Sequence, residues 1–137
     1  MEPIKIDIVI LAPVHKVWDY FNLPEHIVNW NFANEDWHCP KATNDLRVGG
    51  RLESRMEAKD GSFGFDLVGT YDEIIPLKLI RYFLEDGRKV EVYFQEIDSN
   101  TTKVTEAFDP EAANSAEMQR EGWYAILDNF HKYVENN

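Results

Sequence analysis

The chain has 137 residues, 44% of them hydrophobic and 13% aromatic, which fits one domain spanning residues 1–137. Its net charge of −11 argues against nucleic-acid binding, which needs a basic surface, and against docking on an anionic membrane. The one cysteine, Cys39, has no partner for an internal disulfide, and no apolar run is long enough for a signal sequence or a membrane span, so we expect a cytoplasmic protein.

A strand and two short helices are predicted first. Residues 4–11 are rich in Ile and Val and alternate weakly with polar positions, as in a strand, which residues 12–13 end. Pro24 can begin a second short helix that runs to about residue 30. The first helix follows Pro13 directly, because apolar residues recur at helical spacing at Val14, Val17, Trp18 and Phe21.

A long antiparallel meander is predicted next. Residues 31–50 are the least regular part, with a short strand at residues 37–39, and Gly49-Gly50 permits a tight entry into the following strand. Asp60-Gly61 predicts a two-residue hairpin turn. Counting back from that turn places eight residues on one largely apolar face, in the pairs Ala58 with Phe63, Met56 with Phe65, Ser54 with Leu67, and Leu52 with Gly69.

Two further turns extend the sheet. Asp86-Gly87 predicts another two-residue turn, which pairs Phe83 with Val90 and Arg81 with Val92. Residues 98–100 predict a three-residue turn, because a two-residue turn would bury less apolar surface. The three-residue turn gives the pairs Phe94 with Val104, Val92 with Glu106, and Val90 with Phe108.

One long amphipathic helix closes the chain. It is predicted to start near Asn114 or Ser115, since Asn114 and Glu117 fit a capping box. Gly122 in its middle costs about 1 kcal/mol relative to alanine, so we expect a strand or a ligand to approach the helix closely there. The apolar stripe of this helix consists of Met118, Trp123, Ile126, Leu127, Phe130 and Val134.

These elements predict an α+β fold in which a curved antiparallel sheet wraps around the C-terminal helix. The apolar face of a single sheet must be covered, and one helix is the only sizeable element left to cover it. This geometry leaves a hollow between sheet and helix, lined by Phe, Met, Leu and Trp, that suits an apolar ligand.

Five short segments, in their order along the chain, carry a family resemblance. They are residues 12–18 (APVHKVW), 24–30 (PEHIVNW), 45–51 (DLRVGGR) and 69–74 (GTYDEI), then Met118 with Glu121-Gly122-Trp123. The chain resembles the helix-grip fold of the START-like (SRPBCC) superfamily, and within it the domain of the activator of heat-shock-protein-90 ATPase. The resemblance implies an apolar cavity between the sheet and the C-terminal helix, and it supplies no universal catalytic residue. The superfamily includes lipid carriers, hormone receptors, polyketide cyclases, aromatases and co-chaperones, so the fold does not determine the function.

A ligand site is predicted in the hollow. The hypothesis for its polar anchor is that Arg81 and Glu106, in one row across three strands, hold a carboxylate, hydroxyl or carbonyl of the ligand. The alternative is a bulge or slip that turns one or both outward. The residues predicted to bind the ligand are Trp30, Ser54, Met56, Phe65, Leu67, Arg81, Phe83, Val92, Phe94, Val104, Glu106, Met118, Gly122 and Ile126.

No metal or cofactor site is predicted. Residues 35–39 include several metal-ligating types, but no second cluster of His or Cys completes a set of three or four ligands. Cys39 has no evident activating base, and the sequence has no phosphate-binding loop or serine-nucleophile motif. We therefore expect no cofactor and no catalytic residue, with Glu106 the one available acid or base if the chain is an enzyme.

We expect the chain to bind a small apolar or amphipathic molecule in the hollow. Two alternatives stay open. The first is a co-chaperone or stress-response module that contacts a chaperone partner through an exposed surface. The second is a cyclase- or aromatase-like enzyme that acts on a ligand in the same cavity. No nucleic-acid or membrane partner is expected.

Overall fold

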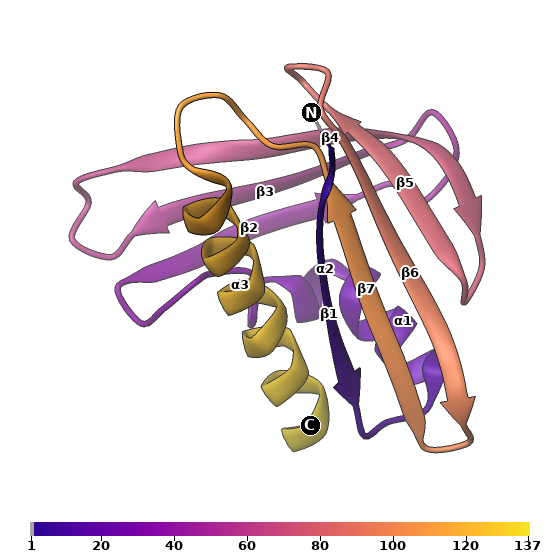
Figure 1. The fold of residues 1–137 in the computed structure, drawn as a ribbon. Helices are drawn as coiled ribbons and strands as arrows, with labels where there is room; N and C mark the ends of the chain where they lie inside the picture. The colour runs from indigo at the N-terminus through magenta and orange to yellow at the C-terminus, as the bar shows by residue number, and fades with distance from the viewer. Residues whose placement is uncertain (1) are drawn as a thin grey trace.

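Seven antiparallel strands form one curved sheet in the computed structural model, which describes residues 2–137. The sheet curls around the C-terminal helix (Figure 1), and the first of the two short helices contacts that helix. The strand order is β1-β7-β6-β5-β4-β3-β2. The elements are β1 (Ile4–Ile10), α1 (Val14–Asn22), α2 (Pro24–Ile27), β2 (Trp37–Asn44), β3 (Arg51–Ala58), β4 (Gly64–Ile75), β5 (Leu79–Leu84), β6 (Lys89–Asp98), β7 (Thr101–Phe108) and α3 (Ala116–Asn136). The predicted α+β helix-grip architecture is confirmed.

The helix boundaries follow local capping chemistry. Pro13 precedes α1, and Pro24 occupies the first turn of α2, which ends at Ile27 and is shorter than predicted. Helix α3 begins one residue after Ser115, whose Oγ accepts a hydrogen bond from the Met118 amide at 3.1 Å. The predicted capping box at Asn114 is wrong, because the Asn114 side chain instead donates to the Glu111 carboxylate at 2.7 Å.

Two of the three predicted hairpin registers are confirmed. Strands β3 and β4 pair Met56 with Phe65 and Ser54 with Leu67, as the turn at residues 60–61 predicts. Strands β6 and β7 pair Val92 with Glu106, as the turn at residues 98–100 predicts. In both hairpins the apolar set therefore lies on the concave face of the sheet.

The predicted register of β5 and β6 is wrong by one residue. The loop between them has three residues, closed by the Leu84 amide donating to the Arg88 carbonyl at 2.8 Å, and Gly87 takes a φ of 90°. Glycine at a positive φ completes the three-residue hairpin loop without steric strain. The pairs are consequently Tyr82 with Val90 and Arg81 with Glu91. Because side chains alternate along a strand, this slip moves every β5 side chain to the face opposite to the predicted one.

The two ends of the chain meet at one edge of the sheet. Strand β1 pairs with β7 from Ile4 opposite Phe108 onward, and α3 packs beside β1. The open edge of β1 is covered by α3, since Arg120 donates to the Lys5 carbonyl at 2.6 Å and the Leu11 amide donates to Glu135 at 2.8 Å. These contacts occupy backbone groups that would otherwise be free to pair with another chain.

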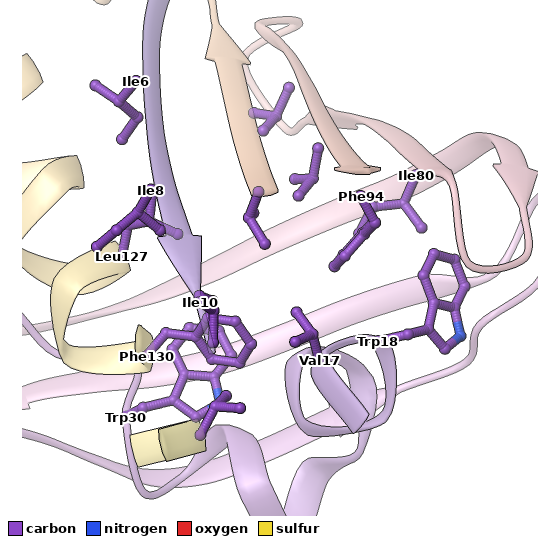
Figure 2. Close-up of a cluster of buried hydrophobic side chains, with 14 of the residues drawn as sticks. Ile6, Ile8, Ile10, Val17, Trp18, Trp30, Ile80, Phe94, Leu127 and Phe130 are labelled. Carbon is purple, nitrogen blue, oxygen red and sulfur yellow. The ribbon is translucent and has the colours of Figure 1, made fainter. Parts of the chain in front are cut away.

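An aromatic core joins the helices to the sheet (Figure 2). The Phe130 side chain of α3 is fully buried, with its ring centroid 4.8 Å from Trp30 and 5.2 Å from Phe21. Ile10 at the end of β1 and Val17 of α1 are also fully buried in this region. This cluster holds α3 at one side of the concave face and leaves the other side to the cavity described below.

Phe130→Ala should lower the free energy of unfolding by about 3–5 kcal/mol, because it removes a large buried ring and leaves a cavity. Met118→Ala, on the exposed side of the same helix, should change it by less than about 0.5 kcal/mol. Urea unfolding of both variants checks this, and equal losses would contradict the assignment of Phe130 to the core.

Candidate functional site

A cavity of about 280 Å³ opens between the concave face of the sheet and the three helices. Its walls are mainly apolar and aromatic, and they come from every strand between β2 and β5, from β7 and from all three helices. The cavity exists because α3 packs on β1, so it does not fill the space over β3, β4 and β5.

The cavity wall on α3 is held by Trp123 and Ile126. The Trp123 ring stacks on Phe108 of β7, with centroids 4.0 Å apart and planes 10° apart. Trp30 also lines the cavity, and its indole N–H donates to the Tyr20 carbonyl at 2.9 Å, which fixes the ring orientation. Aromatic side chains with two rotatable bonds keep such a wall rigid at little entropic cost.

One close approach in the wall depends on a glycine. A Cβ built at Gly69 of β4 would lie 2.6 Å from Cδ2 of the Tyr82 ring. The absence of a side chain at Gly69 thus allows the Tyr82 ring to lie against β4. Tyr82 is 7% exposed and lines the cavity.

A chain of hydrogen bonds fixes the polar end of the wall. The Tyr71 hydroxyl donates to Asn44 Oδ1 at 2.7 Å, and Asn44 Nδ2 donates to the Asn22 carbonyl at 2.8 Å. Burial raises the pKa of the Tyr71 hydroxyl far above its ordinary value, against a smaller opposing effect of the Asn44 hydrogen bond. Tyr71 therefore stays neutral, with its proton committed to Asn44.

Glu106 places a carboxyl group in the cavity without any compensating charge. It lies on the inward side of β7, between Ile6 of β1 and Val92 of β6, and is 8% exposed. Burial alone raises the pKa of this carboxyl from 4.5 to about 8. At neutral pH the group is therefore mainly a neutral carboxylic acid, which donates one hydrogen bond.

Arg88 brings the positive charge of the cavity wall. It follows the β5–β6 loop, and its Nε donates to Asp86 Oδ2 at 2.8 Å. Arg88 does not contribute to the pKa of Glu106, which burial alone raises. The two groups therefore act as separate polar points in one largely apolar cavity.

Two further features are absent from the described residues. Within residues 2–137, no group of three or more His, Cys, Asp or Glu side chains is arranged to hold a metal ion. No helix in that range is long and apolar enough to cross a membrane.

Comparison of the sequence with known protein families identifies the family of this chain. Residues 11–135 match the family described as Activator of Hsp90 ATPase homolog 1-like protein. The chain belongs to this family. The match spans every element from α1 to all but the last residue of α3, so the family assignment covers the entire cavity wall. No curated protein matches the chain significantly.

Solved structures of similar chains share the architecture of this family. The solution NMR structure of the AHSA1-like protein from Aeromonas hydrophila is 41% identical, with a TM-score of 0.87, and the match covers 97% of this chain and 93% of that one. A solution structure from Cytophaga hutchinsonii is 45% identical, with a TM-score of 0.84 and coverage of 98% and 93%. A crystal structure from Chromobacterium violaceum has a TM-score of 0.86 over 100% of both chains at 22% identity, which shows the fold alone.

Half of the ligand-binding residues predicted from sequence line the cavity of this family member. For those on the sheet and on α3, the inward positions follow from the confirmed registers of β3–β4 and β6–β7 and from the apolar stripe of α3. They are Trp30, Ser54, Met56, Phe65, Leu67, Glu106 and Ile126.

The other predicted residues lie elsewhere. Val92, Phe94 and Val104 face inward but are packed in the core. Met118 is 61% exposed, and a Cβ at Gly122 would meet no atom within 4 Å, so no strand approaches the helix there.

The predicted Arg81–Glu106 anchor is wrong. The slip in the β5–β6 register turns Arg81 and Phe83 to the outer face of the sheet. There Arg81 forms ion pairs with Asp72 at 2.8 Å and Glu73 at 3.1 Å. Glu106 alone remains inside.

Several cavity residues were missed. Tyr71 follows Gly69 by two positions on β4, so strand alternation could have placed it inward. Tyr82 would have followed from a three-residue loop after Leu84. Asn44 and Arg88 lie at the ends of irregular segments, where no periodic pattern marks the direction of a side chain.

Gly69→Ala should lower the free energy of unfolding by about 1–3 kcal/mol, because the added methyl forces the Tyr82 ring to move. Gly122→Ala is the matched control with the opposite sign, since it meets open space in a helix and should stabilise the protein by about 0.5–1 kcal/mol. Denaturant titrations of both variants check this. A neutral Gly69→Ala would show that the Tyr82 ring is not confined.

Glu106 should make the protein less stable as pH rises. Its carboxyl has a raised pKa in the folded state, so its stability contribution is complete below pH 4.5 and is lost progressively up to about pH 8. The loss is about 1.4 kcal/mol per pH unit in that window. The free energy of unfolding of Glu106→Gln minus that of wild type should therefore increase between pH 5 and 8 and stay constant above pH 8.

Unfolding titrations at several pH values measure this difference, with Glu96→Gln on the exposed part of β6 as the control. A wild-type curve parallel to that of Glu106→Gln would show that the Glu106 carboxyl is ionised in the folded protein.

Proposed function

We propose that this protein binds a small, largely apolar or amphipathic molecule in the cavity between its sheet and α3. The observation that carries the proposal is the cavity of about 280 Å³, walled mainly by apolar and aromatic side chains with a few polar groups among them. Pockets of this composition are typical of small-molecule sites. Removal of apolar ligand surface from water supplies most of the binding energy, at about 25 cal/mol per Å².

Family membership supports the proposal, since folds of this kind commonly bind hydrophobic ligands. The volume adds a size limit. Ligand pockets range from about 300 to 1,000 Å³. This cavity of about 280 Å³ lies just below that range and suits a compact molecule of one or two rings better than a long-chain lipid.

The wider roles expected from the resemblance remain predictions. These are a chaperone partner, participation in a stress response, and cyclase- or aromatase-type chemistry on the bound molecule. The cytoplasmic location expected from the single cysteine and the absence of a signal sequence also remains a prediction. The cavity supports binding by itself, and Glu106 is the acid that such chemistry would use.

Native mass spectrometry of the protein purified from its own host tests the proposal. We expect a reproducible adduct of low mass in the wild type. Met56→Trp should abolish it, because Met56 is buried against the cavity and the larger ring occupies the ligand volume. Val9→Trp, at an exposed position on the outer side of β1, is the control and should keep the adduct.

Retention of the adduct in Met56→Trp would place the bound molecule outside the cavity. An unliganded mass for the wild type, together with no binding of small ring compounds added in vitro, would contradict the proposed function.

A further inference from the structure

Two ionisable side chains of the cavity wall have no hydrogen-bond partner among residues 2–137. The Glu106 carboxyl and the Tyr82 hydroxyl are both more than nine-tenths buried, and both border the cavity. Neither group receives or donates a side-chain hydrogen bond that affects its protonation. No fully buried side-chain N or O atom in residues 2–137 lacks a partner, so the oxygens of these two groups reach the cavity space. Their hydrogen-bond partner is therefore a molecule inside the cavity, water or ligand.

Both groups are hydrogen-bond donors at neutral pH. The neutral carboxylic acid of Glu106 donates its O–H, and burial together with the nearby Glu106 and Tyr71 raises the pKa of the Tyr82 hydroxyl far above its ordinary value, so it also keeps its proton. The Tyr71 proton is already bound to Asn44. Both groups also have acceptor lone pairs, but each holds a proton that no side chain of residues 2–137 accepts, and a ligand oxygen in the cavity would accept it.

A cationic ligand fits this site poorly. An ammonium group would require ionised Glu106, yet no positive charge or hydrogen bond in the protein stabilises that form. A neutral oxygen acceptor avoids this cost.

We propose that the ligand is a compact ring ketone or quinone whose carbonyl oxygen accepts a hydrogen bond from Glu106, with Tyr82 as a second donor on the cavity wall; this inference rests on the proposed binding function. A neutral carboxylic acid and a tyrosine hydroxyl in apolar surroundings are known to bind carbonyl oxygens and to stabilise negative charge on them. The rings pack against the aromatic walls, and Gly69 keeps the Tyr82 ring in place.

Three matched bicyclic probes test the inference: 1-tetralone, its hydrocarbon tetralin, and 1-aminotetralin. Their affinities for wild type, Glu106→Leu and Tyr82→Phe are measured by calorimetry at pH 6.5. Each substitution should lower the affinity for 1-tetralone by about three- to tenfold, which is the effect of one neutral hydrogen bond. The affinity for tetralin should stay the same or rise. The infrared carbonyl stretch of bound 1-tetralone should lie at lower frequency in wild type than in Glu106→Leu.

The pH dependence of binding gives a second readout. Affinity of wild type for 1-tetralone should fall as pH rises through about 8, because ionised Glu106 no longer donates. Glu106→Gln, whose amide donates at any pH, should show no such fall. The other titratable groups facing the cavity are Tyr71, Tyr82 and Arg88, while α3 presents Trp123 and Ile126. Both tyrosines keep their protons in this range because burial holds the pKa of each far above its ordinary value.

Each contrary outcome is distinct. If the variants lose equal affinity for 1-tetralone and for tetralin, the carbonyl assignment is overturned, while binding in the cavity still stands. Tighter binding of 1-aminotetralin than of 1-tetralone would replace the carbonyl with a cation as the partner of Glu106. If none of the probes binds wild type, the carbonyl assignment fails, and the adduct in native mass spectrometry then separately decides the proposed function.

Discussion

A seven-stranded sheet presents more apolar surface than one helix is able to cover. Seven strands at a spacing of about 4.8 Å span roughly 29 Å, whereas a helix with its side chains is about 10 Å wide. Helix α3 is placed toward the β1 edge, and the short helices α1 and α2 cover part of the remainder. The uncovered part of the concave face is the cavity, so the site follows from the ratio of sheet width to helix width.

The polar groups in this cavity are a cost to stability that a purely structural core would avoid. Leucine at position 106 would continue the inward row of β7 without desolvating a carboxyl. The sequence instead keeps an acid that must remain protonated when the protein folds at neutral pH. Local departures of this kind from good core design are typical of functional positions, and this supports a role for Glu106 in binding.

The sequence predicts the fold and part of the site, and the difference depends on particular turns. The turns at residues 60–61 and 98–100 set the inward positions of Met56, Phe65 and Glu106 correctly, since register follows once the loop length is known. The turn at residues 86–87 permits either a two- or a three-residue loop. A two-residue loop would place Arg81 inside the cavity, whereas the three-residue loop of the structure places Tyr82 there. Residues such as Arg88 enter through loop geometry, which has no periodic signal.

The pairing of β1 with β7 has a consequence for how the chain is made. Ile4 has its strand partner at Phe108, so during synthesis the first strand waits until most of the chain has left the ribosome. In that interval its four isoleucines, all inward in the finished sheet, are exposed to other nascent chains. Lys5 and Asp7 alternate with them on the outward side, and charges at such positions oppose edge-to-edge association. The charges of these two residues therefore oppose association of β1 with other chains before its partner strand has formed.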